Sequence, residues 1–146
     1  MRFMMIVRAT KASEAGGLPS KELLAAMGKF NEEMASAGVM LAADGLQPSS
    51  KGARVKFSGN KRTVVDGPFA ETKELIAGFW MIQASSKQEA IEWAKRSPHP
   101  FETGEAEIEI RQLFELSDFP PDLFAPEDAA REQKLRKDNH RKSARP

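Results

Sequence analysis

The stretch LIAGFWMIQA, residues 75–84, is rich in branched and aromatic residues and gives the strongest strand signal in the chain. A second run, FMMIV at residues 3–7, lies between two arginines and predicts another strand. In both runs consecutive residues are apolar. Because successive side chains of a strand point to opposite faces of the sheet, each of these strands has two apolar faces. Such a strand must be covered on both faces, which places these two in the middle of a sheet.

Two helices are predicted from their caps. Ser20 is a good N-cap for a helix with apolar residues at helical spacing, and Gly38 stands where a left-handed residue ends it. Ser86 and Glu89 have the S-x-x-E spacing of a capping box and open a second helix, which prolines stop ten residues later. Residues 11–19, which include two glycines, are expected to be a loop.

Weaker strand patterns complete the order of elements. Residues 39–43 form a short strand, residues 53–57 and 62–65 form a β-hairpin around a Gly-containing turn, and residues 106–112 alternate cleanly. The order is β-α-β, a hairpin, then β-α-β. Without the hairpin this is the split βαββαβ pattern, so we predict an α+β fold: a ferredoxin-like sandwich with an inserted β-hairpin.

The helices of such a sandwich cover only one face of its sheet. The simplest cover for the other apolar face is the same face of a second copy, which would make a two-fold homodimer of the dimeric α/β-barrel kind. The alternative is that the C-terminal segment folds back over its own sheet.

The composition shifts after residue 115, so we divide the chain into a domain at residues 1–115 and an extension at 116–146. The extension begins with a Pro-rich connector anchored by Phe119, Leu123 and Phe124. A polar helix is expected from Glu127, with acidic residues at its start and basic residues at its end, as the helix dipole favours. We expect it to pack on the dimer and to fray beyond residue 139.

Composition excludes several classes of protein. The absence of cysteine among 146 residues rules out disulfides, thiolate metal sites and a cysteine nucleophile. No apolar run approaches the roughly 20 residues of a membrane span, and the N-terminus lacks a signal-peptide pattern, so we expect a cytoplasmic protein. Residues 1–117 hold 15 basic and 15 acidic residues, which argues against nucleic-acid binding. The tail at 131–146 is mildly basic, a pattern typical of a solvated segment.

A long motif carries a family resemblance. DGPFAETKE at residues 66–74 is followed by GFW at 78–80, with GLQP at 45–48 upstream and AEIEIR at 106–111 downstream. Over roughly residues 1–115 the chain resembles the DGPF subgroup of the YCII-related family. That resemblance implies a dimeric α/β barrel. It also implies relatives of largely unknown activity, among them small-molecule enzymes such as a dehydrochlorinase, with genes often beside those of alternative sigma factors.

The chain departs from this family at one point. Simpler YCII-related proteins are credited with a catalytic histidine on the first helix, paired with an aspartate, and that histidine would align near Met27. The only histidines of this chain are His99 and His140, and neither lies on the first helix. A His–Asp mechanism is therefore not carried over. His99, between two prolines, is typical of a surface residue rather than a catalytic base.

The motif concentrates charged groups that could perform acid–base chemistry. Asp66, Glu71 and Glu74 are the candidate catalytic carboxylates, because paired carboxylates serve as general acid and base when burial or neighbours separate their pKa values. The candidate ligand-binding residues are Lys73, Gly67, Arg8 and Arg62. The alternative is that residues 66–74 form a solvated charged loop, in which Asp66 caps a turn and Gly67 takes a positive φ.

No metal or cofactor is expected, because the spacing of metal ligands and the glycine-rich phosphate motifs are missing from the sequence. The main hypothesis is a dimeric protein that binds a small molecule between its sheet and helices, near Asp66, and that acts as an acid–base lyase or isomerase. The alternative is a non-enzymatic regulatory or interaction module that acts through its surface or its extension.

Overall fold

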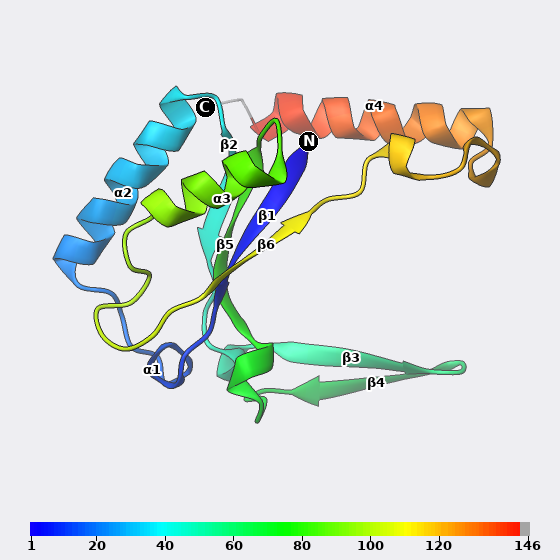
Figure 1. Cartoon of the computed structure of the whole chain (residues 1–146). Helices are drawn as coiled ribbons and strands as arrows, with labels where there is room; N and C mark the ends of the chain where they lie inside the picture. Colours follow the sequence, from blue (N-terminus) through cyan, green and yellow to red (C-terminus); the bar gives the residue numbers. More distant parts are fainter. Residues whose placement is uncertain (144–146) are drawn as a thin grey trace. The chain divides into compact units, whose positions relative to one another are not determined.

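The computed structural model describes residues 1–143 (Figure 1). Arg145, one of the basic residues of the tail, lies outside the described residues. The chain divides into two compact units, Met1–Leu113 and Phe114–Pro146, and each is described by itself. Among the described residues, no helix has both the length and the apolar character needed to cross a bilayer.

The first unit is built on a four-stranded antiparallel sheet with the order β2-β5-β1-β6. Its strands are β1 (Arg2–Arg8), β2 (Met40–Gly45), β5 (Ile76–Gln83) and β6 (Ile108–Gln112). The two strands that are apolar on both faces, β1 and β5, are the central ones, as the βαββαβ pattern predicted. The predicted α+β class is confirmed.

The predicted hairpin is confirmed as a separate two-stranded sheet of β3 (Ala53–Ser58) and β4 (Lys61–Asp66). Ser58 pairs with Lys61, so the turn has two residues, and its Gly59 has a φ of 56°. A glycine with positive φ at the first turn position suits the twist of a hairpin, because a side chain there would be strained.

The main helices begin where their caps were predicted. In α2 (Lys21–Ser36) the hydroxyl of Ser20 accepts the N–H of Leu23, and Gly38 follows the helix with a φ of 70°. In α3 (Lys87–Arg96) the hydroxyl of Ser86 accepts the N–H of Glu89.

The side chain of Glu89, the last residue of the predicted capping box of α3, bonds to Ser85 instead of Ser86. The carboxylate of Glu89 accepts hydrogen bonds from the hydroxyl and the backbone N–H of Ser85, rather than from the N–H of Ser86. Because these two donors favour the charged form, they lower the pKa of Glu89 below its ordinary value.

The loop predicted at residues 11–19 is wrong in its first part, where the structure has α1 (Lys11–Glu14). Thr10 and Ser13 form a reciprocal capping box that starts this single turn. A capping box with serine at its third position is a weaker sequence signal than S-x-x-E, and four residues are too few for a periodic pattern.

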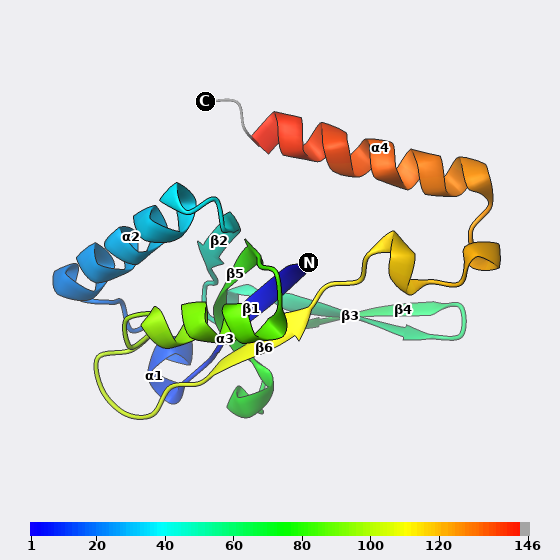
Figure 2. The same cartoon turned by 45° about the horizontal axis from the view of Figure 1, so that its top comes forward.

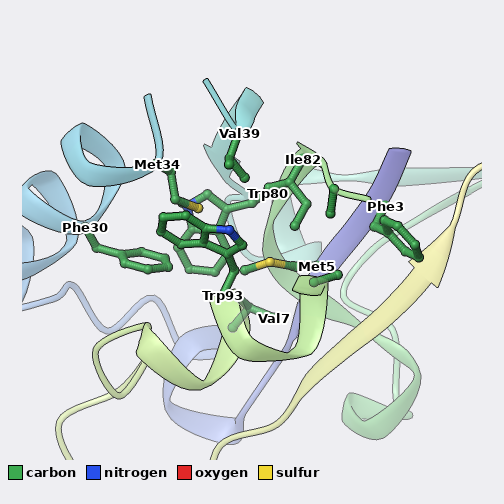
Figure 3. Close-up of a cluster of buried hydrophobic side chains, with 11 residues drawn as sticks. Phe3, Met5, Val7, Phe30, Met34, Val39, Trp80, Ile82 and Trp93 are labelled. Carbon is green, nitrogen blue, oxygen red and sulfur yellow. The ribbon is translucent and has the colours of Figure 1, made fainter. Parts of the chain in front are cut away.

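The core of the first unit lies between the sheet and the helices α2 and α3 (Figure 3). Phe3 and Met5 of β1 and Ile82 of β5 are almost completely buried. Phe30 of α2 packs edge-on against Trp80 of β5, with ring centroids 5.7 Å apart. The indole N–H of Trp80 donates to the side-chain oxygen of Asn31 at 2.7 Å, so the one polar atom of this large ring keeps a partner.

The other side of the sheet carries a second set of apolar residues, which we call the open face. Its centre consists of two cross-strand pairs, Met4 with Met81 and Ile6 with Phe79. All four side chains are half-buried, in contrast to Phe3 and the other core residues, which point toward the helices. The prediction of central strands with two apolar faces is therefore confirmed.

The second unit, as far as residue 143, contains two short 3-10 turns and one long helix. These are η3 (Leu116–Asp118), η4 (Pro121–Leu123) and α4 (Pro126–Ser143). The predicted helix is present and starts one residue before Glu127. It also runs past residue 139, where fraying was expected.

Candidate functional site

Residues 66–74, which we call the 66–74 loop, connect the hairpin to the central strand β5. Asp66 is the last residue of β4 and pairs with Ala53. The N–H of Gly67 donates to the carbonyl of Gly52 at 2.9 Å, and the Gly67–Pro68 peptide bond is cis. The 3-10 turn η2 (Thr72–Glu74) completes the loop. The loop is thus tied to the base of the hairpin on one side and enters the sheet on the other.

The predicted positive φ of Gly67 is wrong, because its φ lies outside the left-handed region that Gly59 and Gly38 occupy. Glycine is required there for a different reason. A Cβ on Gly67 would overlap the carbonyl oxygen of Ser49, a backbone atom that cannot rotate away. The glycine therefore allows two backbone segments to touch.

Ser49 connects the 66–74 loop to helix α1. Its hydroxyl accepts the N–H of Phe69 at 3.1 Å and donates to the carboxylate of Glu14 at 2.5 Å. The backbone N–H of Ser49 donates to the other oxygen of the same carboxylate at 2.9 Å. Glu14 and Ser49 were missed in the sequence, because partners 35 residues apart leave no local pattern.

We expect Ser49→Ala to lower the free energy of unfolding by about 1–2 kcal/mol, because the half-buried N–H of Phe69 loses its acceptor and Glu14 loses a donor. Thermal unfolding followed by circular dichroism measures this. Ser50→Ala is the matched control, since Ser50 is exposed and its change should stay within about 0.5 kcal/mol. Equal melting temperatures for the two variants would show that Ser49 does not hold the loop.

Arg8 is brought to the loop, where it contacts the backbone rather than a candidate carboxylate. Its guanidinium donates to the carbonyl of Lys73, and the N–H of Ala9 donates to the carbonyl of Leu75 at 3.0 Å. The end of β1 is thereby fastened to η2 and to the start of β5.

Arg62 is not brought to the loop. It lies near the tip of the hairpin, where its guanidinium stacks 4.4 Å from the ring centroid of Phe57 and donates to the carbonyls of Gly59 and Lys61. It lies four positions along β4 from Asp66, which corresponds to about 13 Å between their Cα atoms. Arg62 therefore cannot join Asp66 in one compact site within a single chain.

The three candidate carboxylates, Asp66, Glu71 and Glu74, are exposed, and so is Lys73. Their prediction as a catalytic group stays a prediction, and the alternative of a solvated charged loop stays open. Across the described residues, no three carboxylate or histidine side chains are grouped closely enough to hold a metal ion.

The open face continues from the loop. Phe79 and Ile6 form the centre of a cross-strand row with Asp44 of β2 at one edge and Glu109 of β6 at the other. Arg8, at the end of β1, joins this face to the loop through Lys73. An apolar floor is thus bordered by carboxylates and by a loop rich in charge, which is the general composition of a ligand site.

His99 has a structural role in a turn. Its Nδ1 accepts the N–H of Phe101 at 3.1 Å, and its Nε2 lies 3.1 Å from the carbonyl oxygen of Gly104. Both ring nitrogens are therefore engaged by the backbone, which agrees with the interpretation of His99 as a surface residue.

The second unit contains a hollow of its own, of about 450 Å³. Its apolar lining consists of Phe114, Leu116, Phe119, Phe124 and Leu135. The rings of Phe119 and Phe114 are 5.1 Å apart, and those of Phe119 and Phe124 are 5.3 Å apart. Phe119 and Phe124 are thus anchors, as predicted, whereas Leu123 is 64% exposed.

Comparison with known proteins agrees with this architecture. The model of the YCII-related domain matches residues 1–117. The chain belongs to the YCII-related family. An uncharacterized protein of Rhizobium meliloti (strain 1021) is 35% identical over 77 residues, which cover 51% of this chain and 61% of that protein. The match thus spans about three fifths of the length of that relative, and its name states no activity.

Proposed function

We propose that this YCII-related protein belongs to the DGPF subgroup and works as a homodimer, in which the open faces of two ferredoxin-like sheets meet to form a dimeric α/β barrel. The pairs Met4–Met81 and Ile6–Phe79 support this, because four adjacent half-buried apolar side chains make a patch of the kind that marks an interface. A two-fold axis lets the same patch cover itself.

We also propose that the dimer binds a small polar molecule where the 66–74 loop borders the open face. The observation that supports this proposal is the hydrogen bond from the guanidinium of Arg8 to the carbonyl of Lys73, which joins a cation on the open face to the loop that contains the candidate carboxylates. A second copy would enclose this border and exclude water. A border that is closed to water would give Asp66, Glu71 and Glu74 the surroundings that acid–base lyase or isomerase chemistry requires.

A thermal-shift screen of the full chain with small carboxylates, phenols and lactones tests this proposal. A ligand at about 100 times its Kd stabilises the folded protein by about 2.7 kcal/mol, which raises the melting temperature by roughly 8 °C for a chain of this length. We expect the amide variants Asp66→Asn, Glu71→Gln and Glu74→Gln to lose this shift, while their unliganded melting temperatures and dimer mass stay unchanged, because these side chains are exposed.

Glu32→Gln provides the matched control, since Glu32 is an exposed carboxylate on α2 and its variant should keep the full ligand shift. If all three loop variants bind the ligand as the wild type does, the loop does not form the site. The candidate carboxylates would then be a solvated surface.

A second candidate function, a non-enzymatic interaction module, is favoured by the second unit. Phe114, which lines the hollow, is 69% exposed, and Leu123 is 64% exposed, so this unit presents large apolar side chains that a partner could cover. In that case no small molecule would raise the melting temperature, and Leu123→Asp would abolish binding of a protein partner while the loop variants retain it.

A further inference from the structure

The hairpin β3–β4 has two chemically different faces. The cross-strand pairs Val55–Val64 and Phe57–Arg62 share one face, and they alternate with the pairs Lys56–Thr63 and Ser58–Lys61 on the other. The first face is apolar and exposed: Phe57 is 70%, Val64 65% and Val55 52% accessible. This alternation is typical of a hairpin that packs one of its two faces against another part of a protein.

Within its own unit the hairpin is held only near its base. Arg54 lies 3.8 Å from the ring centroid of Phe69, and the N–H of Gly67 donates to the carbonyl of Gly52. Val65 is half-buried, and every other residue of the two strands is exposed. Since an isolated two-stranded hairpin is marginal in water, a partner for the apolar face would add the stability that its own unit does not supply.

The position of the hairpin indicates where that partner lies. Figures 1 and 2 show α2 on one side of the sheet and the hairpin extending away on the opposite side. That is the side of the open face, where Ile6 and Phe79 form the centre of the apolar patch. The hairpin and the open face therefore lie on the same side of the unit.

The charges of the hairpin complement those of the remaining domain. Residues 53–65 contain four basic residues, Arg54, Lys56, Lys61 and Arg62, and no acidic ones. The other residues of 1–117 contain eleven basic and fifteen acidic residues, so they are net negative by the same amount. A hairpin that leaves its own domain would be attracted to the body of another copy.

We propose that the hairpin is an arm that reaches across the two-fold axis and packs Val55, Phe57 and Val64 on the second copy of this chain. This rests on the proposed homodimer and deepens it, because the open faces form the centre of the interface and two reciprocal arms enclose its rim. Arg62, which cannot reach Asp66 within one chain, is carried by the arm to the partner copy.

The double variant Phe57→Asp/Val64→Asp tests the arm in the full chain. Ser58→Asp/Thr63→Asp is its matched control, because it adds the same two charges to the same two strands on the polar face. By analytical ultracentrifugation we expect the first variant to weaken the dimer by at least roughly 100-fold in Kd, since two apolar contacts are lost in each of two symmetric arms. The control should weaken it no more than about tenfold.

A second measurement keeps the result interpretable if the variant hairpin merely unfolds. In the wild type, hydrogen exchange at the backbone amides of residues 53–66 should slow as the protein is concentrated through its dimer Kd, whereas the buried amides of β5 should not change. Exchange in residues 53–66 that is independent of concentration would overturn the arm, whatever the variants do.

The outcomes separate the arm from the dimer. A wild type that is monomeric at micromolar concentration overturns the proposed homodimer together with the arm. A dimeric wild type with equal Kd values for both double variants overturns the arm alone. A 20-base-pair DNA duplex serves as a further probe. If the wild type binds the duplex and Phe57→Asp/Val64→Asp loses this binding but keeps the dimer Kd, the basic hairpin contacts nucleic acid and the arm is overturned.

Discussion

Ile6→Asp is expected to yield a folded monomer, whereas Met5→Asp, one residue earlier, is expected to prevent folding. The two residues lie on opposite faces of β1. Met5 is completely buried between the sheet and the helices, and Ile6 is half-buried on the open face beside Phe79. The same chemical change therefore probes the core in one variant and the proposed interface in the other.

The expected magnitudes differ because the surroundings differ. Truncating a buried methionine costs about 2–5 kcal/mol, and burying an unpaired carboxylate in its place adds to that, so Met5→Asp consumes most of the 5–15 kcal/mol that stabilises a typical domain. For Ile6→Asp the loss falls on association. Ile6 is already half-buried within one copy, so a loss of about 1.5–3 kcal/mol per copy combines the remaining apolar burial with the cost of covering a carboxylate. Lost from both copies, it weakens the dimer by about two to four powers of ten in Kd.

Light scattering coupled to size exclusion gives the mass, and circular dichroism gives the fold. Wild type should have twice the mass of one chain, and Ile6→Asp should have the mass of one chain with an unchanged spectrum. If Ile6→Asp keeps the double mass, the open face is not the interface. If both proteins have the mass of one chain and Ile6→Asp is strongly destabilised, the C-terminal segment covers the face, which was the alternative left open by the sequence.

The sequence predicted the sheet well because its signals are local. Central strands are predicted by composition alone at residues 75–84 and 3–7. The helix ends are predicted by Ser20, Gly38 and Ser86, whose hydrogen bonds involve residues at most four positions away. Which face of β1 meets the helices was not predictable. Both faces are apolar, and only the packing of α2 and α3 decides between Met5 and Ile6.

The candidate site was harder to predict because it depends on contacts between distant segments. The structure brings Arg8 to the 66–74 loop through the carbonyl of Lys73, whereas Arg62 lies near the hairpin tip, and no local pattern distinguishes the two arginines. The link from Glu14 through Ser49 to Phe69 joins three segments that are far apart in the chain. A motif thus identifies the residues that matter, while its partners are fixed by tertiary structure.

Gly67→Ala is the sharpest test of that tertiary contact, and we expect it to lower the free energy of unfolding by about 3 kcal/mol or more, with a fall in melting temperature of roughly 10 °C. The added Cβ would overlap the carbonyl oxygen of Ser49, which already accepts the N–H of Gly52 at 2.9 Å. Since neither backbone can rotate away, the loop must move, and the hydrogen bond from Phe69 to Ser49 should be lost with it.

Gly28→Ala is the control that distinguishes the contact at Gly67 from the general effect of replacing glycine with alanine. Gly28 lies inside α2 with free space around it, so alanine there should stabilise the protein by about 0.5–1 kcal/mol through helix propensity. If alanine raises the free energy of unfolding at position 28 and lowers it at position 67, the loss at Gly67 comes from its contact with Ser49. An unchanged melting temperature for Gly67→Ala would contradict that contact. Glycine at the 66–74 loop would then require another explanation, such as the approach of a ligand to its backbone.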